Sequence, residues 1–202
     1  MFVLVTGGSG SGKSAYAESR ILEFGPGERI YLATMMCFDE ESKKRVERHR
    51  KMREGKGFET AERFLDLKNW EPGSRKKEGQ RAILLECMSN LAANEMFDPA
   101  GSGADTAEEI KKGIEGLLAK CDHLVVVTNE VFSDGISYEK ETEAYLKALG
   151  EINCYMARRA DQVVEVVYGI PIHHRLPETG APLLSGGGKT TGNPIKKEEQ
   201  AL

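Results

Sequence analysis

Apolar, β-branched runs alternate along this chain with longer segments in which apolar residues recur at helical spacing. The apolar runs predict strands at residues 2–6, 29–34, 81–87, 123–129 and 162–168. The helical spacing predicts helices over roughly 13–24, 39–54, 89–97, 106–120 and 138–160. Residues 58–62 are expected to be extended, residues 64–70 to form a short helix, and Thr106 to cap the helix that follows it.

The predicted strands are apolar on both faces, and helix-length segments separate them. This arrangement is typical of a parallel sheet covered by helices, so an α/β domain with a mostly parallel sheet is expected. The domain is predicted to span residues 1–174. After His174 the composition shifts to Gly, Pro, Lys and Thr with little apolar periodicity. Residues 175–202 are therefore expected to be a flexible tail.

Composition and charge narrow the class of protein. The 202 residues carry a formal net charge of −4, which argues against a general electrostatic attraction to nucleic acid. The four cysteines are widely separated and form no CxxC pair, which favours a reduced protein without a metal cluster. The first residues lack the charged leader of a signal peptide, and no apolar stretch is long enough to span a bilayer. A cytoplasmic protein without membrane insertion is expected.

A glycine-rich motif joins the first predicted strand to the first predicted helix. It consists of Gly7, Gly8, Ser9, Gly10, Ser11, Gly12, Lys13 and Ser14, and it matches G-x-x-x-x-G-K-[ST]. Glycines let successive backbone N–H groups turn toward phosphate oxygens at the positive end of a helix. Lys13 would contact the β- and γ-phosphates of a nucleoside triphosphate, and the Ser14 hydroxyl would bind Mg²⁺. The motif therefore predicts a fold of the P-loop NTPase type, with three layers and helices on both faces of the sheet.

Polar residues follow several of the predicted strands, at the edge where ligands bind in sheets of this kind. Ala33 and Thr34 end the second strand, and Glu86 lies at the end of the third. Glu86 occupies the position at which these folds carry an acidic residue for Mg²⁺. A carboxylate at a strand end can also cap a helix, and Asn129 and Glu130 after the fourth strand fit a turn as well as a site.

The segment KKRVERHRKMR, residues 43–53, places a histidine inside a cationic run. On a helix, Arg45, His49 and Arg53 share one face. Two nearby cations disfavour protonation of the imidazole and keep it nucleophilic near pH 7. Attack of His49 on an α-phosphate would form a phosphoramidate and release pyrophosphate. On spacing alone, a solvated basic helix face is the more common meaning of such a run, and the ring could also be a base or a phosphate hydrogen-bond donor.

A set of stretches, in order along the chain, carries a resemblance to a known family. They are LVTGGSGSGKSAYAE at 4–18, YLAT at 31–34, DEE at 39–41, RVERH at 45–49, TAE at 60–62, ILLEC at 83–87, VTNEV at 127–131 and ARRADQVVEVVYGIP at 157–171. Together these stretches resemble the bifunctional adenosylcobinamide kinase / adenosylcobinamide-phosphate guanylyltransferase family of cobalamin biosynthesis. The phosphate loop alone would be generic, whereas its combination with the histidine helix, TAE, LLEC and VTNE is specific.

The resemblance implies two reactions on a corrinoid substrate. The enzyme would phosphorylate the aminopropanol hydroxyl of adenosylcobinamide with ATP or GTP, and then transfer GMP from GTP to that phosphate through a guanylylated histidine, here His49. Mg²⁺ and a homotrimer are also implied. The implied GTP contacts are Gly7, Gly8, Ser9, Gly10, Ser11, Gly12, Lys13, Ser14, Leu32, Ala33, Thr34, Arg50, Lys51, Met52, Arg53, Glu62 and Glu86.

Two other classes of function stay open on the sequence. One is a small-metabolite kinase that uses the phosphate loop and positions phosphates with the basic helix. The other is a non-enzymatic nucleotide switch or binding module. Both lack a covalent nucleotide intermediate, so an adduct formed from α-labelled GTP would separate them from the transferase.

Overall fold

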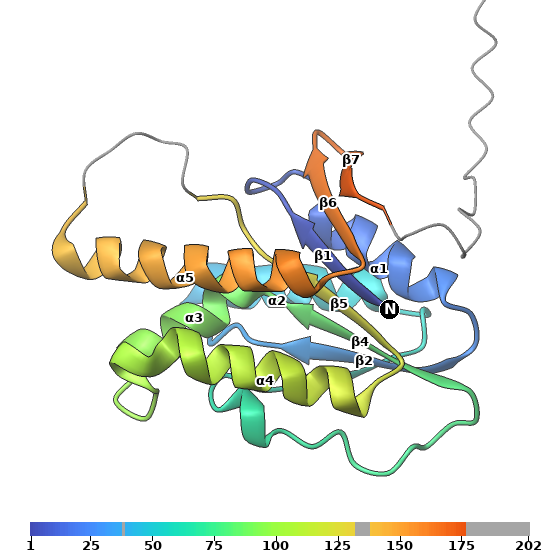
Figure 1. The fold of residues 1–202 in the computed structure, drawn as a ribbon. Coiled ribbons are helices and arrows are strands. Elements are labelled where there is room, and N and C mark those ends of the chain that lie inside the picture. The colour runs from blue at the N-terminus through green and yellow to red at the C-terminus, as the bar shows by residue number, and fades with distance from the viewer. Residues whose placement is uncertain (38, 132–137, 177–202) are drawn as a thin grey trace, which may run out of the picture.

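The computed structural model describes residues 1–37, 39–131 and 138–176 (Figure 1). Its strands are β1 (Phe2–Thr6), β2 (Gly27–Ala33), β3 (Phe58–Glu62), β4 (Gln80–Glu86), β5 (His123–Val127), β6 (Gln162–Val167) and β7 (Ile170–Arg175). They form one seven-stranded sheet in the order β3-β2-β4-β5-β1-β6-β7. Neighbouring strands run parallel except β6 and β7, which pair antiparallel. The predicted α/β architecture with a mostly parallel sheet is confirmed.

The helices agree closely with the predicted ones. They are α1 (Lys13–Glu23), α2 (Glu40–Arg53), α3 (Met88–Phe97), α4 (Thr106–Lys120) and α5 (Lys140–Arg159), with short 3-10 turns η1 (Leu67–Asn69) and η2 (Gly103–Asp105). None of the helices in the described ranges is long and apolar enough to cross a membrane.

Two details of the prediction were wrong. Thr106 is the first residue of α4 and not its cap, because η2 immediately precedes it and its hydroxyl donates to the Gly103 carbonyl at 2.7 Å. The predicted tail begins too early, because Arg175 lies in β7, a strand whose every residue is exposed. Residues 177–202 of the predicted tail lie outside the described part of the chain.

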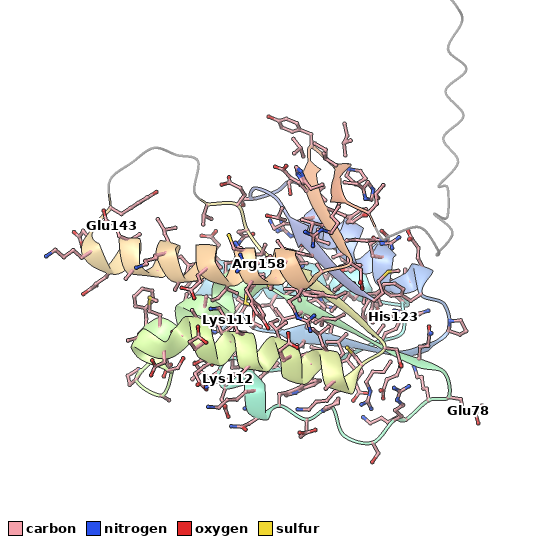
Figure 2. The ribbon with its side chains drawn as sticks, viewed as in Figure 1. Glu78, Lys111, Lys112, His123, Glu143 and Arg158 are labelled. Carbon is pink, nitrogen blue, oxygen red and sulfur yellow. The ribbon has the colours of Figure 1, made fainter. Side chains whose placement is uncertain are left out.

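Apolar side chains fill a layer on each face of the sheet. Adjacent strand residues point to opposite faces. Leu85 packs with residues of α3, α4 and α5, while its neighbour Leu84 packs with Ala17 and Ile21 of α1. Figure 1 shows α4 and α5 crossing in front of the sheet. Lys111, labelled on α4 in Figure 2, forms an ion pair with Glu151 of α5. The predicted helices on both faces are confirmed.

The contact between α4 and η1 depends on a glycine. A Cβ at Gly113 would lie 2.8 Å from Leu67 Cβ and 2.9 Å from Leu67 Cγ. Gly113→Ala is expected to lower the free energy of unfolding by about 1–2 kcal/mol, since overpacking outweighs the gain in helix propensity. Gly116→Ala on the same helix is the control, because its nearest contact would be an ordinary 3.7 Å. Urea unfolding measures both. Equal stability of the two variants would contradict the packing argument.

Candidate active site

The glycine-rich loop is shaped by residues with positive φ. Gly10 and Gly12 have φ of +71° and +94°. These values favour glycine because a side chain would clash with its own backbone. Lys13 begins α1 and is 9% exposed, and its Nζ donates to the Gly8 carbonyl at 2.9 Å. The loop therefore curls around its own lysine, as a phosphate-binding loop does.

The tip of the β6–β7 hairpin lies against this loop. The backbone N–H of Gly169 donates to the Ser11 carbonyl at 2.8 Å. A Cβ at Gly12 would lie 3.3 Å from Gly169 Cα, so the two backbones are in close contact. The tip of the β6–β7 hairpin thus supports the glycine-rich loop, although the two are far apart in the sequence.

Glu86 brings side chains from several elements together. It is 9% exposed at the end of β4. Its Oε1 accepts a hydrogen bond from Ser14 Oγ of α1, and its Oε2 accepts one from the Tyr31 hydroxyl of β2 at 3.1 Å. The same Oε1 lies 3.8 Å from His49 Nδ1 of α2. The Glu86 carboxylate therefore lies between Ser14, the other residue predicted to bind Mg²⁺, and His49, the predicted nucleophile.

The chemistry of Ser14 and Glu86 fits Mg²⁺. A hydroxyl and a carboxylate oxygen in direct contact are hard oxygen donors of the kind that Mg²⁺ prefers. Among the described residues, no group of three or more His, Cys, Asp or Glu side chains is placed to hold a metal ion. Phosphate oxygens and water would complete the coordination of an ion held here, which is usual for Mg²⁺ bound together with a nucleotide.

His49 is largely enclosed. Its side chain is 16% exposed and its Nδ1 has no hydrogen-bond partner. Burial lowers the pKa of His49, with Arg48 and Arg53 adding to the effect, while Glu86 and Glu18 oppose it. The predicted direction is confirmed, but its main cause is desolvation and not the flanking cations. The side chain of Arg45, the other predicted flanking cation, lies outside what the structure describes.

The lowered pKa of His49 has a measurable consequence. We expect His49 to titrate below 6.5 and to be neutral at pH 7, as followed by the NMR shifts of its ring protons. Between its folded pKa and about 6.5, His49 then binds fewer protons in the folded state than in the unfolded state. His49 contributes nothing to pH-dependent stability above that value, and destabilises the fold as the pH falls toward its folded pKa. A signal, assigned with His49→Asn, that titrates above 6.5 would contradict the burial argument.

Arg53 lies one helical turn after His49 and is only 6% exposed. Its Cζ lies 3.3 Å from the centre of the Tyr31 ring. Its Nε and Nη1 are buried without hydrogen-bond partners. Arg50, on the adjoining face of α2, lies 3.5 Å from Glu62 through Nη2 and Oε1. Arg53 thus offers a desolvated guanidinium whose unused donors suit an anion.

A cavity of about 410 Å³ unites most of the predicted site residues. Those in its lining are Ser9, Gly10, Ser11, Gly12, Lys13, Ser14, Ala33, His49, Arg50, Met52, Arg53, Glu62 and Glu86. The phosphate loop, the histidine and the strand-end carboxylate therefore open on the same space. A larger hollow of about 600 Å³ shares Arg50, Arg53 and Thr60 with this cavity, but neither the phosphate loop nor His49 lines it.

The remaining predicted residues lie outside the cavity lining. They are Gly7, Gly8, Leu32, Thr34 and Lys51. The Leu32 side chain is part of the core, and the buried Thr34 hydroxyl donates to the Cys87 carbonyl at 2.8 Å. Lys51 is exposed, pairs with Glu47 at 3.1 Å and lines the larger hollow.

The cavity also contains residues that were not predicted as site residues. They are Ala15, Tyr31, Met35, Val46, Arg48, Thr60, Cys87, Asn90 and Asn129. Tyr31 lies in an apolar strand, and that pattern predicts a core residue. Arg48 is adjacent to His49 in a run of cations, where the sequence gives no reason to prefer it over Arg45. Asn129 follows a predicted strand, where the sequence fits a turn as well as a site.

Comparison with known proteins gives a consistent set of relatives. A family model described as "Cobinamide kinase / cobinamide phosphate guanyltransferase", CobU, matches residues 3–174. The "Bifunctional adenosylcobalamin biosynthesis protein CobU" of Escherichia coli (strain K12) is 31% identical over 183 residues, covering 85% of this chain and 98% of the relative. The protein of the same name from Salmonella typhimurium (strain LT2) gives the same identity and coverage.

The solved structures that match this chain share much less of its sequence. An ATPase from the type III secretion system of pathogenic bacteria is 10% identical, with a TM-score of 0.49, covering 88% of this chain and 59% of that one. The flagellar accessory protein FlaH from Methanocaldococcus jannaschii is 14% identical, with a TM-score of 0.39, covering 87% of this chain and 78% of that one.

Proposed function

Because the chain belongs to the cobinamide kinase / cobinamide phosphate guanyltransferase family, we propose that it catalyses both reactions on adenosylcobinamide, with His49 as the covalent nucleophile. It would first phosphorylate the substrate and then transfer GMP from GTP to the new phosphate. The family match supports a bifunctional enzyme of cobalamin biosynthesis. The covalent step is supported by one observation above all, which is that His49 and the phosphate loop line the same cavity.

The phosphate loop would hold the β- and γ-phosphates of GTP, or of ATP in the kinase step. Lys13 would supply positive charge to them, and the inward N–H groups of the loop would bind their oxygens. Mg²⁺, held by Ser14 and Glu86, would neutralise phosphate charge when bound. Arg53 would take the α-phosphate with the donors that lack partners in the free protein.

The covalent step follows from the orientation of the imidazole. Nδ1 faces Glu86 at 3.8 Å, so Nε2 is the nitrogen left to attack the α-phosphorus. The P–N bond forms as the bond from the α-phosphorus to the bridging oxygen breaks, and pyrophosphate leaves. With the proton on Nδ1, that N–H would face the carboxylate, which would stabilise the positive charge that develops on the ring.

The second transfer reverses the bonding at the same phosphorus. A phosphate oxygen of adenosylcobinamide phosphate attacks, the P–N bond breaks, and His49 returns to its neutral form. The corrinoid leaves with GMP joined to its phosphate. In the kinase step the aminopropanol hydroxyl instead attacks the γ-phosphorus, the bond from that phosphorus to the β,γ-bridging oxygen breaks, and the nucleoside diphosphate leaves. The hydroxyl proton passes to solvent, so His49 does not take part as a nucleophile.

The proposal is tested with GTP labelled at the α- or the γ-phosphate. We expect only the α-label to stay on the protein after denaturation, and acid to release it. Adenosylcobinamide phosphate, added before denaturation, is expected to remove the label from the folded enzyme. Absence of an adduct with intact phosphate transfer to the corrinoid would favour a small-metabolite kinase. Nucleotide binding without turnover of either corrinoid would favour a binding module.

The assembly and the location are proposed on the family resemblance alone. We propose a cytoplasmic homotrimer. Light scattering coupled to size-exclusion chromatography measures the mass of the assembly, and a monomeric mass at catalytic concentration would overturn the trimer.

A further inference from the structure

We propose that Tyr31 is a positioning residue for guanylyl transfer, in which its hydroxyl orients the Glu86 carboxylate and its ring keeps Arg53 apart from that carboxylate. The inference rests on the proposed function, because it concerns the step at His49. Tyr31 is 5% exposed, and it contacts the residues predicted to hold Mg²⁺ and the α-phosphate.

The hydroxyl fixes one end of the carboxylate. It donates to Glu86 Oε2 at 3.1 Å, which leaves Oε1 to meet Ser14 and to face His49. A tyrosine hydroxyl is protonated at neutral pH, so it acts as the donor in this hydrogen bond. Without this bond the carboxylate is free to rotate, and Oε1 loses its fixed place beside Ser14 and His49.

The ring acts on the other charged group. Arg53 stacks on it at 3.3 Å, and Glu86 is bound at its hydroxyl end. Both charges are nearly buried, and opposite charges in such surroundings attract strongly. Within the described part of the chain, Glu86 nevertheless faces His49 and forms no ion pair with Arg53. The ring thus holds the guanidinium against one of its faces, and the Nε and Nη1 of Arg53 remain without a hydrogen-bond partner in the protein.

Two substitutions separate the two roles. Tyr31→Phe removes the hydroxyl and keeps the ring, so we expect guanylylation of His49 to slow about 10-fold while the Kd for GTP stays within about twofold. Tyr31→Leu removes both, which allows Arg53 to pair with Glu86. In that variant the Kd for GTP is expected to rise about 10-fold or more as well, with a larger loss of labelling.

Tyr155→Phe is the matched control. The Tyr155 hydroxyl of α5 donates to Glu115 of α4 at 2.6 Å, which is another tyrosine–glutamate bond but outside the cavity. We expect wild-type labelling and wild-type GTP affinity in this variant. Rapid-quench labelling gives the rate, calorimetry gives the Kd, and thermal unfolding shows that each variant is folded.

The outcomes are distinguishable. Labelling of Tyr31→Phe at the wild-type rate, or an equal loss in Tyr155→Phe, would overturn the role of the hydroxyl. Equal GTP affinity in Tyr31→Leu and Tyr31→Phe would overturn the role of the ring. Absence of any adduct in the wild type would instead overturn the proposed function, and the GTP affinities of the two variants would still decide whether the ring protects Arg53.

Discussion

His49→Asn is expected to abolish labelling by α-labelled GTP, by at least about 10³-fold, while phosphate transfer to adenosylcobinamide continues within about threefold. Asparagine has a polar side chain that fits the space, but its amide nitrogen is not nucleophilic. The kinase reaction uses the γ-phosphate and a hydroxyl of the substrate, so it does not need the imidazole. The label on denatured protein and the yield of corrinoid phosphate measure the two activities separately.

His174→Asn provides the control for this substitution. His174 lies on the exposed strand β7, where its Nε2 contacts Glu165 at 2.9 Å, away from the cavity. We expect this variant to retain both activities. An adduct retained in His49→Asn would mean that another side chain is the nucleophile. Loss of both activities in His49→Asn would mean that His49 contributes mainly to nucleotide binding.

Lys13→Ala is expected to reduce both reactions by about 10²–10³-fold. Lys13 is the cation that the phosphate loop encloses, and phosphoryl transfer depends on placing positive charge where negative charge moves. The kinase step loses charge at the γ-phosphate, and the guanylyl step loses it at the departing pyrophosphate. Steady-state kinetics of each step, together with the Kd for GTP, measure the effect.

Lys112→Ala tests whether loss of a lysine is harmful in itself. Lys112 is exposed on α4, as Figure 2 shows, and pairs with Glu109 at 2.7 Å. Surface pairs of this kind contribute little to stability, so we expect unchanged activity. If Lys13→Ala lost guanylylation but kept kinase activity, the γ-phosphate would have to bind outside the glycine-rich loop.

The sheet was predictable because buried parallel strands are continuous apolar runs. Leu84 and Leu85 both require burial, and only a strand with a helix layer on each side provides it. β7 was not predicted, because its six residues are exposed and Pro171 interrupts its pattern. That strand forms through pairing with β6, a contact that local sequence does not encode.

The site was predictable only in part, because some of its features depend on contacts between segments that are distant in the sequence. The glycine-rich loop carries its geometry in its own sequence, and the structure places Lys13 and Ser14, the predicted phosphate and Mg²⁺ contacts, in the lining of one cavity. Tyr31 and Leu32 are adjacent and equally apolar in pattern, yet they point to opposite faces, and the cavity lies beside only one of them. Which face carries the cavity depends on how the whole sheet packs. The desolvation of His49 likewise arises from neighbours distant in sequence.

The bond between Gly169 and Ser11 bears on how tightly a nucleotide is held. A free glycine-rich loop would lose about 1–2 kcal/mol of backbone entropy per residue when a ligand orders it. Here the hairpin tip already restrains the loop, so part of that ordering accompanies folding and does not oppose binding. If the proposed triphosphate binds here, its affinity is expected to gain from preorganisation by a hairpin more than a hundred and fifty residues along the chain.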